Sequence, residues 1–152
     1  MPTRTRLAEF VPYLMSVTAN VVSDLIAGEY RAAYGLKIPE WRVMAVLGDS
    51  GARTQRELVH ATRMDKVAVN RACKVLEDRG LVRRSPNAQD GRSHHLELTA
   101  TGHAMHGQIM PHALDIERNL LAPLSPAERE QFVTLLARIG ASAEALEEGK
   151  SK

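Results

Sequence analysis

The chain has 152 residues, of which 44% are hydrophobic, 25% charged and 4% aromatic. That length can bury a core without disulfides or metal ions. The single cysteine, Cys73, excludes an internal disulfide and fits a reducing compartment. We expect no signal peptide and no membrane span, so the sequence predicts a soluble cytoplasmic protein.

The charge is unevenly distributed along the chain. Residues 52–95 carry ten basic and five acidic side chains, whereas the remaining residues carry ten basic and thirteen acidic ones. A basic middle segment between acidic ends favours a module that binds a polyanion such as nucleic acid. A solvated charged surface is the alternative.

The first third of the chain predicts two helices. Residues 3–34 repeat apolar side chains at three- and four-residue steps, which is typical of a long amphipathic helix. Pro12 either bends its first turn or marks where the helix proper begins. Gly35 is expected to end this helix, and Pro39 to open a shorter one that reaches about Asp49.

Two short helices with clear start signals follow. Thr54 and Glu57 form a capping box at the start of the first. Asp65 is expected to cap the second, which spans residues 65–79 and which Gly80 ends.

After Gly80 apolar and polar residues alternate with a period of two, which predicts a β-hairpin. Strands are expected at residues 81–85 and 93–98, and a very short one at residues 52–53. The turn formers of residues 86–92 predict a polar, basic loop between the hairpin strands.

The C-terminal third is predicted to be helical again. Thr99 or Thr101 is expected to start a long helix, which Pro111 should kink or loosen. Ser125 and Glu128 form a second capping box at the start of the last helix. The fold class is therefore mainly α with a small β-hairpin.

The order helix, short turn, helix and basic hairpin indicates a winged helix-turn-helix, whose second helix enters the DNA major groove. On the outer face of helix 65–79, Arg71 can bond guanine bidentately, and Asn70 can do so with adenine. Val67 or Ala68 can pack on a thymine methyl group. The further residues expected to contact DNA, mainly through phosphates, are Thr54, Gln55, Lys66, Lys74 and His94.

The hairpin loop forms the wing, with its tip at Asp90-Gly91-Arg92. Gly91 can supply a positive φ for the turn, and Arg92 can extend into the minor groove. Asp90 is expected to hold the loop by bonding backbone amides or an arginine such as Arg84 or Arg92.

Several stretches carry a family resemblance. They are Trp41-Arg42-Val43-Met44, Thr54-Gln55-Arg56-Glu57-Leu58, Asp65-Lys66, Leu76-Glu77-Asp78-Arg79-Gly80-Leu81-Val82-Arg83-Arg84, Asp90-Gly91-Arg92 and Leu98-Thr99-Ala100-Thr101-Gly102. In this combination they resemble the multiple antibiotic resistance regulator (MarR) family of winged-helix repressors.

The resemblance implies a homodimer that binds a pseudo-palindromic operator. Dimerisation helices at residues 1–34 and 101–152 would flank a DNA-binding domain at residues 35–100. Each protomer would place one recognition helix in a half-site, about 34 Å from the other. The implied function is a repressor of a nearby operon that a small molecule releases.

The resemblance also implies an effector pocket between the dimerisation helices and the winged lobe, often taking aromatic acids or related anions. Arg42 could pair with a carboxylate or with a phosphate-bearing coenzyme A thioester. Trp41 and Met44 are equally suited to the core, and we favour the core for both. The candidate pocket residues are Tyr13, Val17, Tyr30, Trp41, Arg42, Met44 and Ile109.

Metal and redox control are the alternatives within this fold. His103 and His106 lie three residues apart, and His94 and His95 are adjacent, but a metal site needs three or four convergent ligands. Cys73 falls on the inward face of helix 65–79 and fits a small buried residue better than a peroxide sensor.

We expect no cofactor and no enzymatic activity, because the sequence has no glycine-rich phosphate loop, nucleophile motif or paired carboxylates. A winged helix used only for protein contact is a further alternative.

Overall fold

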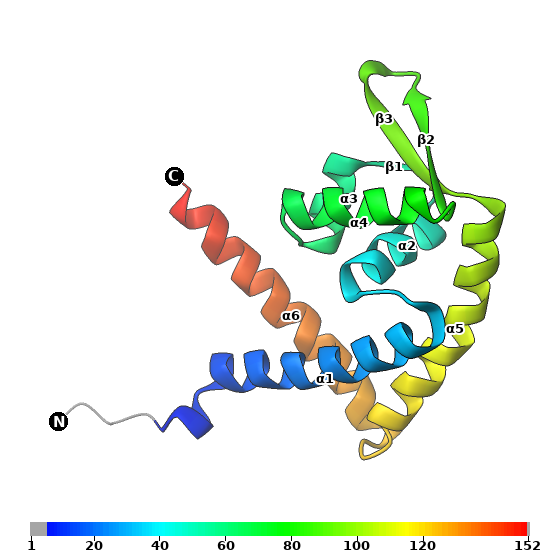
Figure 1. Cartoon of the computed structure of the whole chain (residues 1–152). Helices are drawn as coiled ribbons and strands as arrows, with labels where there is room; N and C mark the ends of the chain where they lie inside the picture. Colours follow the sequence, from blue (N-terminus) through cyan, green and yellow to red (C-terminus); the bar gives the residue numbers. More distant parts are fainter. Residues whose placement is uncertain (1–5, 152) are drawn as a thin grey trace. The chain divides into compact units, whose positions relative to one another are not determined.

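The computed structural model describes residues 6–151, apart from the side chain of Asp90. Its elements are η1 (Leu7–Glu9), α1 (Val11–Tyr34), α2 (Ile38–Ser50), β1 (Arg53–Thr54), α3 (Gln55–Thr62), α4 (Lys66–Asp78), β2 (Val82–Asn87), β3 (Asp90–Leu98), α5 (Ala100–Leu120) and α6 (Pro126–Lys150) (Figure 1). The predicted fold class, mainly helical with a small hairpin, is confirmed.

The chain divides into two compact units within α5. The first unit ends at Ile109 and the second begins at Met110. The boundary lies beside Pro111, which lacks the N–H that would continue the helical hydrogen bonds. The division into residues 1–34, 35–100 and 101–152 that the resemblance implies remains a prediction about function.

Helix α1 starts later than the apolar periodicity suggests. Phe10 is extended and separates α1 from the short turn η1, so Pro12 stands in the first turn of α1. Residues 3–5 of the expected helix lie outside the described residues. Gly35 ends α1 in the left-handed conformation at φ 64°, as predicted, and its N–H donates to the carbonyl of Arg31.

The core of the first unit lies between α2, α3, α4 and the sheet. The inward face of α4 is formed as predicted by Val69, Ala72, Cys73 and Leu76, which are all buried. Burial of a large aliphatic side chain contributes about 1.5–3 kcal/mol relative to exposure. The other fully buried side chains are Leu36, Val43, Met44, Leu47, Leu58, Leu81, Leu96 and Ile109.

The helix-turn-helix forms as its capping signals predict. The Thr54 hydroxyl accepts from the Glu57 N–H at 3.2 Å, and an Asp65 carboxylate oxygen accepts from the Ala68 N–H at 2.8 Å. Arg63 joins the two helices in the left-handed conformation, with φ 56°. These contacts fix where α4 begins, and thus which of its residues face outward.

The sheet has the order β1-β3-β2, and both pairings are antiparallel. The predicted loop over residues 86–92 is wrong, because Pro86 and Asn87 belong to β2 and β3 begins at Asp90. Pro86 is tolerated because β2 is an edge strand, where a missing N–H breaks no second pairing. The turn is formed by residues 88–89.

The base of the hairpin is fixed to the start of α5. The Thr99 hydroxyl donates to the Gly80 carbonyl at 2.6 Å and accepts from the Gly102 N–H at 3.1 Å. Thr99, and not Thr101, therefore starts α5. A Cβ on Gly102 would lie 2.0 Å from the Leu81 carbonyl oxygen, so only glycine allows this close approach.

In the second unit, α6 begins at the predicted capping box. The Ser125 hydroxyl accepts from the Glu128 N–H, and the Ser125 N–H donates to the Glu128 carboxylate. Arg129 forms an ion pair with Glu117 at 2.8 Å, which connects α6 to α5. The pKa of Glu128 is lowered because its carboxylate accepts the Ser125 backbone and side-chain hydrogen bonds.

Apolar side chains remain uncovered along α1 and α6. Most of the large hydrophobic residues of α1 are exposed, from Val11 to Leu25, and so are those of α6 from Phe132 to Leu146. Helix α1 is long and apolar enough to cross a membrane by length and composition alone. The core helix of a soluble protein passes the same test, so the expectation of no membrane span stays a prediction.

Candidate nucleic-acid interface

The outer face of α4 exposes most of the predicted contact residues. Their positions alternate with the buried stripe at three- and four-residue steps, so they share one solvent face. Val67 is 63% exposed, although the other large apolar residues of α4 are buried or half-buried. Lys66, Asn70, Arg71 and Lys74 are also exposed, and Ala68 is half-exposed.

One ion pair lies on this face. Lys74 approaches Asp78 at 3.6 Å, and both side chains are at least two-thirds exposed. Such a pair contributes little to stability, so the Lys74 ammonium can exchange Asp78 for a phosphate at little cost.

A basic hollow of about 510 Å³ lies between the start of α3 and the wing. Thr54, Gln55, Arg92 and His94, which were predicted to contact DNA, are brought together in it. The lining also includes Arg56, Arg84, Asn87 and Ser93, and all eight lining residues are neutral-polar or basic. Such a lining suits an oxyanion such as a backbone phosphate.

Sequence reasoning missed Arg56, Asn87 and Ser93. Arg56 was read only as part of a family motif, and Asn87 only as a turn former. Asn87 donates its side-chain amide to the Ser93 hydroxyl at 3.0 Å and accepts from the Gln89 N–H at 3.0 Å. Asn87 thus holds the turn of the wing, a role that the sequence analysis gave to Asp90.

The predicted wing tip needs correction. Residues 88–89 form the turn, whereas Gly91 and Arg92 lie within β3. Gly91 does not have a positive φ, so its expected role in the turn is wrong. The side chain of Asp90 lies outside the described residues, so its contacts stay a prediction, as does the minor-groove role of Arg92.

Arg84 holds the base of the wing and not its tip. Its Nε donates to the carboxylate of Glu77 on α4, which is half-buried, whereas Arg84 itself is exposed. On the same strand, Arg83 pairs with Glu97 of β3 at 2.8 Å. Arg84 thus links the wing to the recognition helix, and its expected pairing with Asp90 stays a prediction.

The proposed effector residues differ widely in burial, and the pocket that they would form stays a prediction. Met44 and Ile109 are completely buried in the core, and Arg42 is exposed on α2. Tyr13 and Val17 are each 41% exposed on α1. The basic hollow includes no residue of the candidate set.

An aromatic cluster joins two of these candidates. Tyr30 is buried and meets Trp41 edge-on, with ring centroids 5.2 Å apart. His106 stacks on Trp41, with ring centroids 5.9 Å apart. A Cβ on Gly48 would lie 2.3 Å from Nε2 of His106, so α2 needs a glycine there to receive this ring.

Burial changes the acidity of three groups. It lowers the pKa of His106, helped by His103 and opposed by Asp49, and it raises the pKa of Tyr30. It also raises the pKa of Cys73, although a hydrogen bond from Gln55 and the charge of Arg84 act in the opposite direction. A buried thiol with a raised pKa is a poor nucleophile.

The metal alternative has no cluster to support it. Among the described residues, no three His, Cys, Asp or Glu side chains are grouped closely enough to hold a metal ion.

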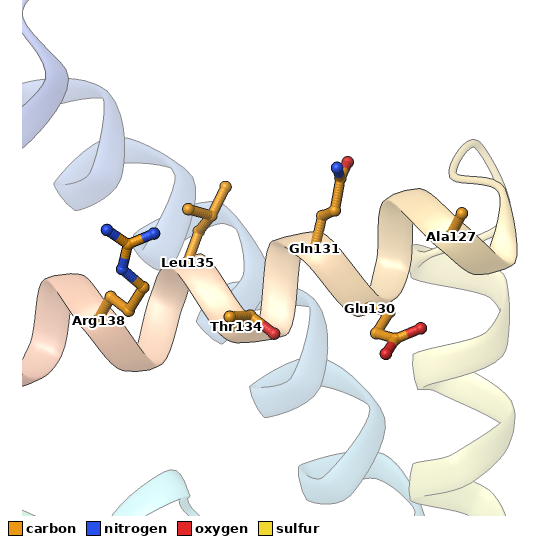
Figure 2. Close-up of a pocket in the computed structure, with 6 residues that line it drawn as sticks. All are labelled: Ala127, Glu130, Gln131, Thr134, Leu135 and Arg138. Atoms are coloured by element: carbon orange, nitrogen blue, oxygen red, sulfur yellow. The ribbon is translucent and has the colours of Figure 1, made fainter.

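The second hollow lies along α6 and measures about 590 Å³ (Figure 2). Its lining residues Ala127, Glu130, Gln131, Thr134, Leu135 and Arg138 all come from this one helix. The sequence analysis did not single out this surface. Its lining is mostly polar, and Leu135 is the one residue that it shares with the exposed large apolar residues of α6.

Two helices joined by a tight turn, with a hairpin beside them and a basic outer surface, define a winged helix-turn-helix DNA-binding protein. The family model described as MarR family matches residues 34–93. Transcriptional regulator HosA of Escherichia coli O157:H7 is 31% identical over 101 residues, which make up 66% of this chain and 75% of HosA. The chain belongs to the MarR family of transcriptional regulators, as the sequence resemblance indicated.

Solved structures agree with this assignment. A probable transcriptional regulator from Pseudomonas aeruginosa superposes with a TM-score of 0.79 at 30% identity, covering 88% of this chain and 99% of that one. BpsR of Bordetella bronchiseptica, whose DNA binding is regulated by 6-hydroxynicotinic acid, has a TM-score of 0.77 at 26% identity. The match covers 86% of this chain and 98% of the BpsR chain.

Proposed function

We propose that this protein is a cytoplasmic, homodimeric repressor that binds a pseudo-palindromic DNA operator and is released by a small anionic effector. The observation that carries the proposal is the exposed outer face of α4 beside the basic hollow of the wing. Relatives named as repressors, among them NicR of Pseudomonas putida, support this mode of regulation.

The division of labour on DNA follows from side-chain chemistry. Arg71 and Asn70 offer bidentate bonds to purine edges, and Val67 and Ala68 offer apolar contacts to thymine methyl groups. The basic hollow, with Arg56 at its edge, would receive a backbone phosphate. Phosphate contacts position the protein on the duplex, whereas contacts from α4 read the sequence.

The dimer is supported by the exposed apolar residues of α1 and α6. A large exposed apolar surface on a soluble protein often marks an interface. A second copy of the chain would cover it by two-fold symmetry. The apolar character of α1, sufficient for a membrane span by composition, has the same explanation.

An aromatic acid, or its coenzyme A thioester, is the effector class that we propose. The regulation of BpsR by 6-hydroxynicotinic acid supports it, and Arg42 would supply a cation for the carboxylate. The effector would favour a spacing of the two recognition helices that does not match the operator.

Selection from a random pool of double-stranded DNA tests the proposed function. The selected sequences should be pseudo-palindromic, and their affinity should fall steeply with salt, because bound phosphates release counterions. Light scattering should give a dimer at micromolar concentration. Failure to enrich any sequence, with no salt-dependent affinity, would favour a winged helix that contacts only protein.

A thermal-shift screen tests the effector class. A carboxylate such as 6-hydroxynicotinic acid or benzoate, present at 100 times its Kd, should stabilise the native state by about 2.7 kcal/mol. Benzoyl-coenzyme A tests the thioester. Arg42→Gln should weaken the shift by the carboxylates, and an unchanged shift would exclude Arg42 from the site.

A further inference from the structure

One side chain connects the C-terminal ends of two helices that are far apart in sequence. Arg79 is the C-cap residue of α4, and its Nη1 donates to the Gly35 carbonyl at 3.2 Å. Its Nη2 donates to the Tyr34 carbonyl at 3.0 Å. The planar fork of a guanidinium suits two adjacent carbonyls, and its charge is favourable at the negative end of α1.

Arg79 is not needed to end its own helix. Gly80 has φ 71°, and its N–H donates to the Glu77 carbonyl at 2.9 Å. The Leu81 N–H donates to the Leu76 carbonyl at 2.9 Å and completes the closure of α4. The Arg79 guanidinium is therefore directed entirely at the end of α1.

The last turn of α1 is itself firmly seated in the first unit. The Tyr34 hydroxyl donates to the Gln108 carbonyl of α5 at 3.2 Å, and Tyr30 packs on Trp41 of α2. Leu36, directly after the helix, is completely buried. Arg79 thus joins the recognition helix to a part of α1 that cannot easily give way.

We propose that Arg79 is a positioning residue that fixes the recognition helix relative to α1, and through α1 sets the spacing of the two half-sites. This inference rests on the proposed dimer, in which α1 contributes to the interface. Arg79 touches no DNA in this scheme. Its loss should change the discrimination between half-site spacings, and leave single half-site affinity nearly intact.

The experiment uses the full-length protein and the operator selected by the wild type. Operators with the half-sites at the selected spacing, and with one base pair added or removed, are compared with a single half-site at low salt. Each base pair moves a half-site by about 3.4 Å and rotates it around the duplex, so a rigid dimer should discriminate strongly.

Arg79→Gln should lower the affinity for the selected spacing about tenfold, which is a usual size for coupling between sites. It should reduce the preference over the shifted spacings and leave the half-site affinity within about twofold. Arg79→Lys retains the charge but loses the planar fork of the guanidinium, so its effect should lie between those of the wild type and Arg79→Gln. Arg118→Gln is the matched control, since it removes an exposed arginine that pairs with Asp115 of α5.

Each outcome decides the question. A preserved spacing preference in Arg79→Gln overturns the role of Arg79 and leaves the proposed repressor intact. If the wild type shows no preference for any half-site spacing, both the proposed dimer on a pseudo-palindromic operator and this inference are wrong. Equal losses on the half-site and the full operator would indicate a merely structural role. If Arg79→Gln melts below the assay temperature, the same affinities are measured with Arg79→Lys, and its spacing preference tests the role of Arg79.

Discussion

The guanidinium of Arg84 on β2 donates to the carboxylate of Glu77 on α4, and this ion pair joins the wing to the recognition helix. Glu77 is half-buried in the last turn of α4, next to buried Leu76. The wing and α4 should therefore approach DNA as one rigid unit, because rotation of either relative to the other would break this ion pair. The first prediction tests this link.

Glu77→Gln should destabilise the protein by about 1 kcal/mol, a value kept small because both side chains retain contact with solvent. It should also weaken DNA binding by loosening the wing. Urea unfolding and a mobility shift measure the two effects. Asp78→Asn is the control, since it removes the same charge from the exposed pair with Lys74. Equal effects of the two substitutions would contradict the link.

Arg71 and Lys74 should differ in what they contribute to binding. Arg71→Ala should lose about 1–3 kcal/mol of discrimination between operator and scrambled DNA, because a bidentate contact to a base edge is lost. Lys74→Ala should weaken binding to both DNAs alike and reduce the salt slope by about one. Fluorescence anisotropy over a salt series separates the two, and unchanged discrimination in Arg71→Ala would refute its assigned role.

Val67 offers a test at the level of a single methyl group. Its side chain is 63% exposed on the outer face of α4, where packing on a thymine methyl is the expected contact. Replacing operator thymines by deoxyuridine, one at a time, should reduce wild-type affinity severalfold at one position, since a buried methylene-sized group contributes about 0.8 kcal/mol. Val67→Ala should show no such loss there. A wild type indifferent to every replacement would remove Val67 from base recognition.

The sequence predicted some of these features well, for reasons that lie in local structure. The two faces of α4 follow from helical periodicity and from one cap, Asp65, so burial matched the predicted stripe. The wing turn was misplaced because turn formers such as Pro86 are compatible with an edge strand, and only the pairing shows which strand is at the edge.

Contacts between distant segments could not be predicted in this way. The cluster of Tyr30, Trp41 and His106 comes from three different helices, so no spacing along the chain indicates it. The same holds for Arg79, whose carbonyl partners lie 44 and 45 residues away. The motif that contains Arg79 was recognised, but its contact with α1 depends on how the helices pack.

Cys73 should be inert while the protein is folded. Its side chain is completely buried and its pKa is raised by that burial, so little reactive thiolate is present at neutral pH. Iodoacetamide should label the native protein slowly and the urea-unfolded protein fast, as measured by mass spectrometry. Peroxide that abolished DNA binding in the wild type but not in Cys73→Ser would instead establish redox control.

His106 should make stability depend on pH. Burial against Trp41 and Gly48 lowers its pKa below the ordinary value of about 6.5, with His103 acting in the same direction and Asp49 against it. The unfolded chain then binds the proton more readily than the folded one. The stabilising contribution is therefore complete above pH about 6.5 and is lost as pH falls through the lower pKa of the folded state.

The pH dependence is measured by urea unfolding between pH 5 and pH 8 at constant ionic strength. His106→Gln should reduce the slope of the free energy of unfolding below pH about 6.5, because one group no longer takes up its proton on unfolding. His60→Gln, which replaces an exposed histidine of α3, should leave that slope almost unchanged. The assignment to His106 fails if both variants retain the wild-type slope, since the acid sensitivity would then come from other groups.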